Sequence, residues 1–184
     1  MHPLRLSLFA LIFLALFSMN NAEADEEPIE IGLLNPITGP ISVYSTGFGD
    51  AAEIAITELN EIYDGDYEFS LVEADSACDG TTAASAAQAI IDSDVVGIAG
   101  AACSGATLAA SEVASDAGVV MVSYASTSPA ITDYDDNGYL FRVVPSDAQQ
   151  GQAMAAVAEE EEFSYPAIIY MTNDYGAGLA NTFV

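Results

Sequence analysis

Hydrophobic and polar residues alternate along the chain in blocks that favour strands followed by helices. Short apolar or alternating runs, typical of strands, occur at residues 29–34, 67–71, 95–99, 119–123 and 139–144. Between most of them lie longer stretches whose apolar residues are three and four positions apart, which is the spacing of one helix face. This alternation predicts an α/β fold with a doubly wound parallel sheet.

Three helices are expected between the first four strands, at about residues 48–62, 80–92 and 107–117. In the first, one face is predicted to be formed by Ala52, Ala55, Leu59 and Ile62. Asp79 is a predicted N-cap for the second helix. The inward face of that second helix is predicted to hold Ala83, Ala86, Ala87 and Ile90.

The organisation changes near Pro145. Residues 25–144 contain all five strands and are expected to form one lobe, whereas residues 145–184 contain a helix at 148–162, a strand at 167–171 and one helix start. One and a half such units are too few to bury a core of their own. We therefore expect residues 145–184 to begin a second lobe of a longer protein, with docking onto the first lobe as the alternative.

The first 24 residues have the pattern of a secretory signal peptide. Arg5 precedes an apolar run from Leu6 to Phe17, and Ala22-Glu23-Ala24 is a typical cleavage site. The run is shorter than the ~20 residues that a membrane-spanning helix needs. We expect export to the periplasm or the extracellular space, with cleavage after Ala24.

Charge excludes several classes of function. The net charge is -26, and Arg142 is the only basic residue after the predicted cleavage site. Nucleic-acid binding is not expected without a basic patch, and a P-loop is impossible without its lysine. The only histidine, His2, lies in the signal peptide, so no triad base or zinc ligand of that type remains. No enzyme activity, metal or cofactor is expected.

Two cysteines, Cys78 and Cys103, are present in a chain that is expected to be exported. An even number of cysteines in an oxidising compartment favours one disulfide. A metal site is the alternative, but it lacks a histidine partner. We expect the disulfide.

Ligands of doubly wound sheets bind outside the carboxyl ends of the strands, which directs attention to three loops. Ser104 follows the third strand at a helix start, where free N–H groups favour an anion. Small and hydroxyl residues at 124–129 follow the fourth strand, and Tyr44 follows the first. Each has an ordinary alternative, since Ser104 is also a typical N-cap, residues 126–128 a surface turn and Tyr44 a packing residue. Their common edge of the sheet favours a small-ligand pocket.

Four ordered stretches together resemble the branched-chain amino-acid-binding proteins, the Leu/Ile/Val-type receptors of ABC importers. They read IEIGLLNPITGPISVYSTGFGDAAEIAITELN, ADSACDGTTAASAAQAIID, AACSGATLAASEVASDAGVVMVSYASTSPAIT and FRVVPSDAQQG. The resemblance implies a type I periplasmic-binding-protein fold, in which two Rossmann-like lobes close on a ligand. It also implies the same cysteine pairing.

The resemblance implies particular site residues as well. It assigns the carboxylate of an amino-acid-like ligand to Ser104, Ala125 and Thr127, and pocket walls to Tyr44 and Tyr175. Asp147 is a further candidate ligand residue, at the crossing between lobes. The second-lobe acid that pairs with the ligand ammonium in this family is not found before Val184. The expected ligand is a small amino-acid-like molecule, with a branched-chain amino acid as the first choice.

The resemblance implies a monomeric, non-catalytic solute receptor that delivers its ligand to a membrane permease. Its rival is the extracellular sensing domain of a signalling receptor, which uses the same fold. A separate possibility is a calcium loop at 133–138, which matches the first half of an EF-hand. Val144 stands where that motif needs glutamate, so a polar turn is the better interpretation.

The acidic composition predicts a salt requirement. Repulsion among the carboxylates should destabilise the fold at low ionic strength, and added salt should screen it. We expect the melting temperature of the exported protein to rise steadily from low to molar KCl in thermal unfolding. A melting temperature that stays flat over that range would contradict adaptation to a saline medium.

Overall fold

The computed structural model describes residues 27–183, and the predicted signal peptide at 1–24 lies outside them. Five strands form one parallel sheet in the order β2-β1-β3-β4-β5. The strands are β1 (Ile29–Asn35), β2 (Phe69–Asp75), β3 (Gly97–Ala99), β4 (Val120–Ser123) and β5 (Leu140–Arg142). The α/β fold with a parallel sheet is confirmed. The order reverses between β1 and β3, which is the switch point of a doubly wound sheet.

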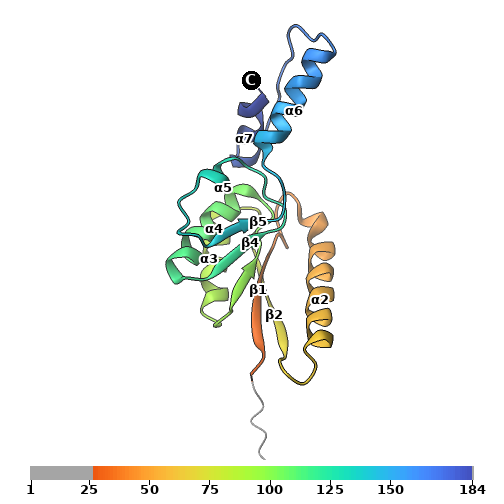
Figure 1. Cartoon of the computed structure of the whole chain (residues 1–184). Coiled ribbons are helices and arrows are strands. Elements are labelled where there is room, and N and C mark those ends of the chain that lie inside the picture. Colours follow the sequence, from red (N-terminus) through yellow and green to blue (C-terminus); the bar gives the residue numbers. More distant parts are fainter. Residues whose placement is uncertain (1–26, 184) are drawn as a thin grey trace, which may run out of the picture.

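Helices cover the two faces of this sheet unequally (Figure 1). The elements are η2 (Ser42–Tyr44), α2 (Ser45–Ile62), α3 (Gly80–Ile91), α4 (Ser104–Ala117), α5 (Ala130–Asp133), α6 (Asp147–Glu160) and α7 (Asp174–Phe183). α3 and α4 pack side by side on one face, and α2 lies on the other against β1 and β2. α6 and α7 lie beyond the edge where the strands end.

The core lies between the sheet and the pair α3 and α4. Small residues dominate the helix side of this layer, including the buried Ala83, Ala87, Ala106, Ala110 and Ala114. Larger side chains from the strands, such as Leu34, Ile98 and Met121, fill the opposing layer. Because the helices present little more than methyl groups, they approach each other and the sheet closely, which holds the start of α4 near the ends of β3 and β4.

The predicted second helix is confirmed in its start and its face. The Asp79 carboxylate accepts a hydrogen bond from Thr82 N–H, so it is the N-cap of α3. This bond lowers the pKa of Asp79, since it favours the charged form. Ala83, Ala87 and Ile90 are buried and Ala86 packs against the same core.

The predicted face of the first helix was wrong in part. Ile56 is the buried residue of α2, with Ala52 and Leu59 half-buried, whereas Ala55 is exposed and Ile62 is 72% exposed. The residues that face the sheet are thus Ala52, Ile56 and Leu59, at the spacing i, i+4, i+7, with Ile56 in place of the predicted Ala55. α2 rests on β1 and β2 alone, so this narrow line is sufficient for the contact.

The strand expected at residues 167–171 is absent from the described structure. The segment is irregular and its side chains are largely exposed, with Ile169 at 98%. A strand needs a neighbour to pair its backbone groups, and no strand between residues 27 and 183 lies beside this segment. Among the same residues, no helix combines the length and apolar character required to cross a membrane.

The segment before β5 is a polar turn, as preferred from the sequence. Asp136 accepts a hydrogen bond from Gly138 N–H at 2.7 Å through its carboxylate, and Asn137 and Gly138 have positive φ angles of 53° and 83°. The side chain of Asp136 therefore stabilises the chain reversal by accepting from a backbone N–H two residues further on.

A disulfide joins Cys78 to Cys103, as predicted, across a sequence separation of 25. Cys78 follows β2, and Cys103 is the residue immediately before α4. The bond therefore fastens the loop after β2 to the start of the helix that carries Ser104.

Loss of this bond should destabilise the protein. We expect Cys103→Ser to lower the free energy of unfolding by roughly 3 to 4 kcal/mol, because the closed loop restricts the unfolded chain. Urea unfolding with and without reductant measures the effect. The double variant Cys78→Ser, Cys103→Ser is the control, since reductant should leave it unchanged. Two titratable thiols in the unreduced parent would contradict the pairing.

Candidate functional site

The candidate site lies at the edge where the parallel strands end. The loop after β3 leads into α4, the loop after β4 carries residues 124–129, and the loop after β1 leads to η2. α7 packs against α4 from beyond this edge (Figure 1). Residues from these segments therefore meet near the switch point between β1 and β3, where doubly wound sheets bind ligands.

Ser104 is the first residue of α4, and Cys103 before it is the N-cap position. Ser104 is thus not the capping residue that its type suggested. Its side chain is buried at 2% exposure, and its hydroxyl oxygen accepts a hydrogen bond from Ser128 N–H at 3.3 Å. The hydroxyl hydrogen has no acceptor among the contacts of the described residues. Ser104 therefore keeps a donor available beside the unpaired N–H groups of the first helical turn.

The hydroxyl of Thr127 differs from that of Ser104, because it has no hydrogen left to donate to a ligand. It donates to a carboxylate oxygen of Asp147 at 2.7 Å, which uses its only hydrogen. Asp147 is 1% exposed, and its backbone N–H donates to Thr127 O at 2.8 Å. The two residues are therefore held together by a pair of bonds, and the Thr127 hydroxyl can only accept further hydrogen bonds.

Asp147 also links the C-terminal helices to this edge. It is the first residue of α6, and its carbonyl accepts a hydrogen bond from the Thr182 hydroxyl of α7 at 3.0 Å. Its second carboxylate oxygen is buried without a partner among the described atoms. A buried, half-satisfied carboxylate is costly, so it leaves one acceptor for an incoming donor.

Tyr44 lies at the end of η2 and is 60% exposed. Its ring packs against Phe48, with centroids 6.2 Å apart, and Phe48 packs against Tyr124 at 5.0 Å. Tyr124 donates its hydroxyl hydrogen to Leu34 O at 3.1 Å, and burial, helped by the negative charge of Glu73, raises its pKa well above the usual value. This aromatic series joins Tyr44 to the loop that contains the half-buried Ala125.

The structure does not bring Tyr175 to the same set of contacts. Tyr175 lies near the start of α7 and lines an apolar cavity of about 420 Å³ between residues 166–171, α6 and α7. Its neighbour Asp174 instead faces α4, since a Cβ atom at Gly105 would lie only 2.5 Å from Asp174 Oδ2. A carboxylate therefore already lies at the N-terminal end of α4.

Two charged residues, Asp75 and Arg142, shape the loops around this edge. The Asp75 carboxylate accepts hydrogen bonds from the N–H and hydroxyl of Thr38 and from Ala77 N–H. Partial burial favours a higher pKa for Asp75, but these bonds outweigh it and lower the pKa below its usual value. The Arg142 guanidinium donates to Ser128 O at 2.8 Å and to the Thr132 hydroxyl. The one described cation is therefore used within the protein.

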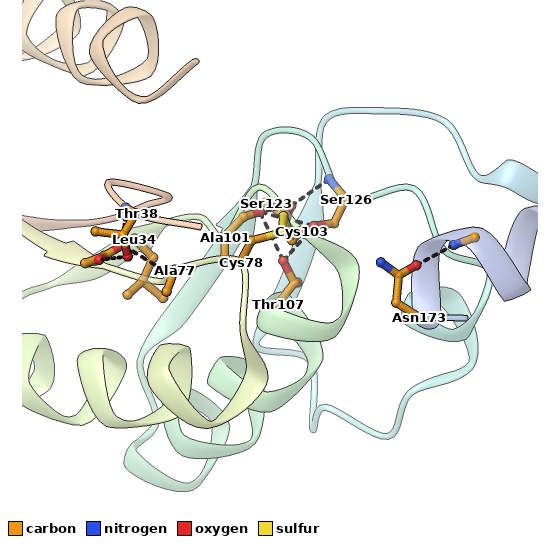
Figure 2. The surroundings of a disulfide bond; sticks show 12 residues. Leu34, Thr38, Ala77, Cys78, Ala101, Cys103, Thr107, Ser123, Ser126 and Asn173 are labelled. Carbon is orange, nitrogen blue, oxygen red and sulfur yellow. Dashed lines mark hydrogen bonds between the residues drawn. A yellow bond between two sulfur atoms is a disulfide. The ribbon is translucent and has the colours of Figure 1, made fainter. Parts of the chain in front are cut away.

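Sequence reasoning missed three buried hydroxyls at this edge, those of Thr107, Ser123 and Ser126. They meet around the carbonyl of Ala101 beside the disulfide (Figure 2). Only the run of hydroxyl residues at 126–128 pointed towards them. Between residues 27 and 183, no group of three or more histidine, cysteine or acidic side chains is arranged to hold a metal ion.

Comparison with known proteins identifies the family to which the chain belongs. The family described as "Receptor family ligand binding region" matches residues 48–184. A leucine-, isoleucine-, valine-, threonine- and alanine-binding protein of Pseudomonas aeruginosa is 32% identical over 179 residues, which are 94% of this chain and 46% of that protein. The chain thus spans about half the length of the curated relatives that it matches.

Solved structures of such proteins share the fold. A leucine-binding protein of Thermotoga maritima superposes with a TM-score of 0.71 at 31% identity, over 84% of this chain and 44% of that one. A branched-chain amino-acid transporter substrate-binding protein of Streptococcus pneumoniae, in complex with isoleucine, superposes with a TM-score of 0.75 at 28% identity, over 85% and 46%. The chain belongs to the family of receptor ligand-binding regions that includes the branched-chain amino-acid-binding proteins.

Proposed function

We propose that the protein is a non-catalytic receptor for a zwitterionic amino acid with an apolar side chain, and that it delivers this ligand to the permease of an ABC importer. The observation that carries the proposal is the opposite polarity of two hydroxyls at the sheet edge. Ser104 has a hydrogen to donate, and Thr127 has only lone pairs to offer. An α-amino acid carries one acceptor group and one donor group on the same carbon atom, which matches this pair.

The ligand carboxylate is assigned to Ser104 and to the N–H groups of the first turn of α4. These neutral donors and the helix dipole stabilise an anion without a basic residue. The closeness of the Asp174 carboxylate to Gly105 supports this assignment, since one acidic group already lies beside the start of α4. Asp174 would move aside as the ligand enters.

The ligand ammonium is assigned to Thr127, with the Ala125 carbonyl as a second acceptor. The buried Asp147 carboxylate holds the Thr127 hydroxyl hydrogen away from the ligand and adds a negative charge behind it. This modifies the expectation from sequence, in which both Thr127 and Ala125 bound the carboxylate. Asp147 acts on the ligand through Thr127 in this proposal.

The apolar part of the ligand is assigned to the aromatic residues. Tyr44 is held at the edge by Phe48 and Tyr124, and Tyr175 on the α7 side would approach when residues 145–184 move as part of a second lobe about a hinge near 144–146. The relatives named for binding leucine, isoleucine and valine support an apolar side chain of that size. The proposal also includes export through the predicted signal peptide and a monomeric state. The acidic surface is proposed to suit a saline medium.

Ligand analogues separate the two roles. In calorimetry on the full-length protein, we expect Ser104→Ala and Thr127→Val each to weaken leucine binding by roughly ten- to a hundredfold, because each removes a hydrogen bond to a charged group worth about 1.5 to 3 kcal/mol. 3-Methylbutylamine lacks the carboxylate, so Ser104→Ala should leave its weaker binding unchanged. 4-Methylpentanoate lacks the ammonium and should be indifferent to Thr127→Val.

Two variants remove hydroxyls elsewhere and serve as controls. Ser115 lies in the last turn of α4, where it donates to Asp136 O, and Thr57 lies on the exposed side of α2. Ser115→Ala and Thr57→Val should bind leucine like the parent. A parent that binds no amino acid, or a Ser104→Ala variant that binds leucine normally, would show that the function or the site is wrong.

A further inference from the structure

Three buried hydroxyls meet at the carbonyl oxygen of Ala101 (Figure 2). The oxygen lies 2.7 Å from Ser123 Oγ, 3.0 Å from Thr107 Oγ1 and 3.1 Å from Ser126 Oγ. Thr107 Oγ1 and Ser126 Oγ are themselves 2.7 Å apart. Ser126 N–H donates to Ser123 Oγ at 3.0 Å. All three side chains are at most 1% exposed, so these groups have only each other as partners.

Counting hydrogens shows that this cluster is self-sufficient. Each hydroxyl has one hydrogen, and a carbonyl oxygen has two lone pairs. Ser123 gives its hydrogen to Ala101 O. Of Thr107 and Ser126, one donates to the other, and the other donates to Ala101 O. Both arrangements use all three hydrogens and fill both lone pairs, so no buried donor is left over.

The cluster joins the two loops that carry the proposed ligand contacts. Thr107 lies one turn after Ser104 on α4, and Ser126 is the residue before Thr127. The bond between Thr107 and Ser126 is therefore a direct side-chain link between the carboxylate side and the ammonium side of the site. The disulfide fastens Cys103 on the same loop to Cys78, so this loop is held at two points.

We propose that Thr107 and Ser126 are positioning residues that set the spacing between Ser104 and Thr127 to that of an α-amino acid. This inference rests on the proposed function. The relevant spacing is short, since the carboxylate and the ammonium of the ligand leave the same carbon atom. A small separation of the two loops would therefore remove one of the two contacts.

Loss of either residue should change geometry more than stability. In Thr107→Val, Ser126 donates its hydrogen to Ala101 O, and in Ser126→Ala, Thr107 does so. The carbonyl therefore keeps two donors in each case, and no buried polar group is left unpaired. What is lost is the direct bond between Thr107 and Ser126, while the bonds from Ser123 to Ala101 O and from Ser128 N–H to Ser104 still join the two loops. The two substitutions remove the same bond, so their effects on binding should not add.

The experiment is a double-mutant cycle on the full-length protein with leucine as the ligand. We expect Thr107→Val and Ser126→Ala each to weaken binding by roughly tenfold, the size of one net hydrogen bond, and the double variant to bind no more weakly than the singles. Thr107→Ser should restore parental binding, since it keeps the hydroxyl. Ser111→Ala is the matched control, because Ser111 is equally buried on α4 but bonds only to Leu108 O.

Hydrogen exchange without ligand provides an independent measurement. Backbone amides at residues 124–128 should exchange faster in Thr107→Val and Ser126→Ala than in the parent, and not in Ser111→Ala. If the parent does not bind leucine, the proposed function fails, but this measurement still decides whether the hydroxyl pair holds the loops. Unchanged exchange in both variants, additive losses of affinity, or an equal loss in Ser111→Ala would overturn the inference.

Discussion

Backbone groups at the carboxyl edge of a parallel sheet lose their strand partners at the point where the chain turns into loops, and buried groups of this kind must find other partners. Most of the features described at this edge follow from that requirement. The Tyr124 hydroxyl bonds Leu34 O at the end of β1, and hydroxyls bond Ala101 O after β3. The groups that remain unsatisfied at the start of α4 are the ones to which the proposed ligand carboxylate is assigned. Fold completion and ligand recognition therefore draw on the same set of polar groups.

The sequence predicted most of the sheet because its signals are local. Apolar runs identified the five strands, and the Asp79 carboxylate marked the start of α3 through a bond to a residue three positions away. Which residues of α2 face the sheet depends on where β1 and β2 lie. Periodicity alone therefore predicted Ala55 on the buried face, where the structure has Ile56. The strand predicted at 167–171 was wrong for a related reason. Its composition is typical of a strand, but a strand also needs a neighbour with which to pair.

The site was only partly accessible to the same reasoning. Loops after strands could be named, and Ser104 and Thr127 among them, because the position of strand ends follows from topology. Whether each hydroxyl donates or accepts could not be predicted, because this depends on partners distant in sequence, such as Asp147 for Thr127. The link from Thr107 to Ser126 is of the same kind. The single described cation, Arg142, bonds a loop carbonyl, so the polar recognition proposed here depends on neutral donors and acceptors.

The contact between Gly105 and Asp174 has a consequence for sequence variation. A Cβ atom at position 105 would lie 2.5 Å from Asp174 Oδ2, so a side chain there would require the Asp174 side chain to rotate away from α4. Glycine at position 105 therefore allows the carboxylate of Asp174 to lie against the start of α4. A chain that acquires alanine there would need a shorter or displaced residue opposite. Where related chains differ at the position of Gly105, a change at the position of Asp174 is therefore expected to accompany it, since the two residues lie where α7 meets α4.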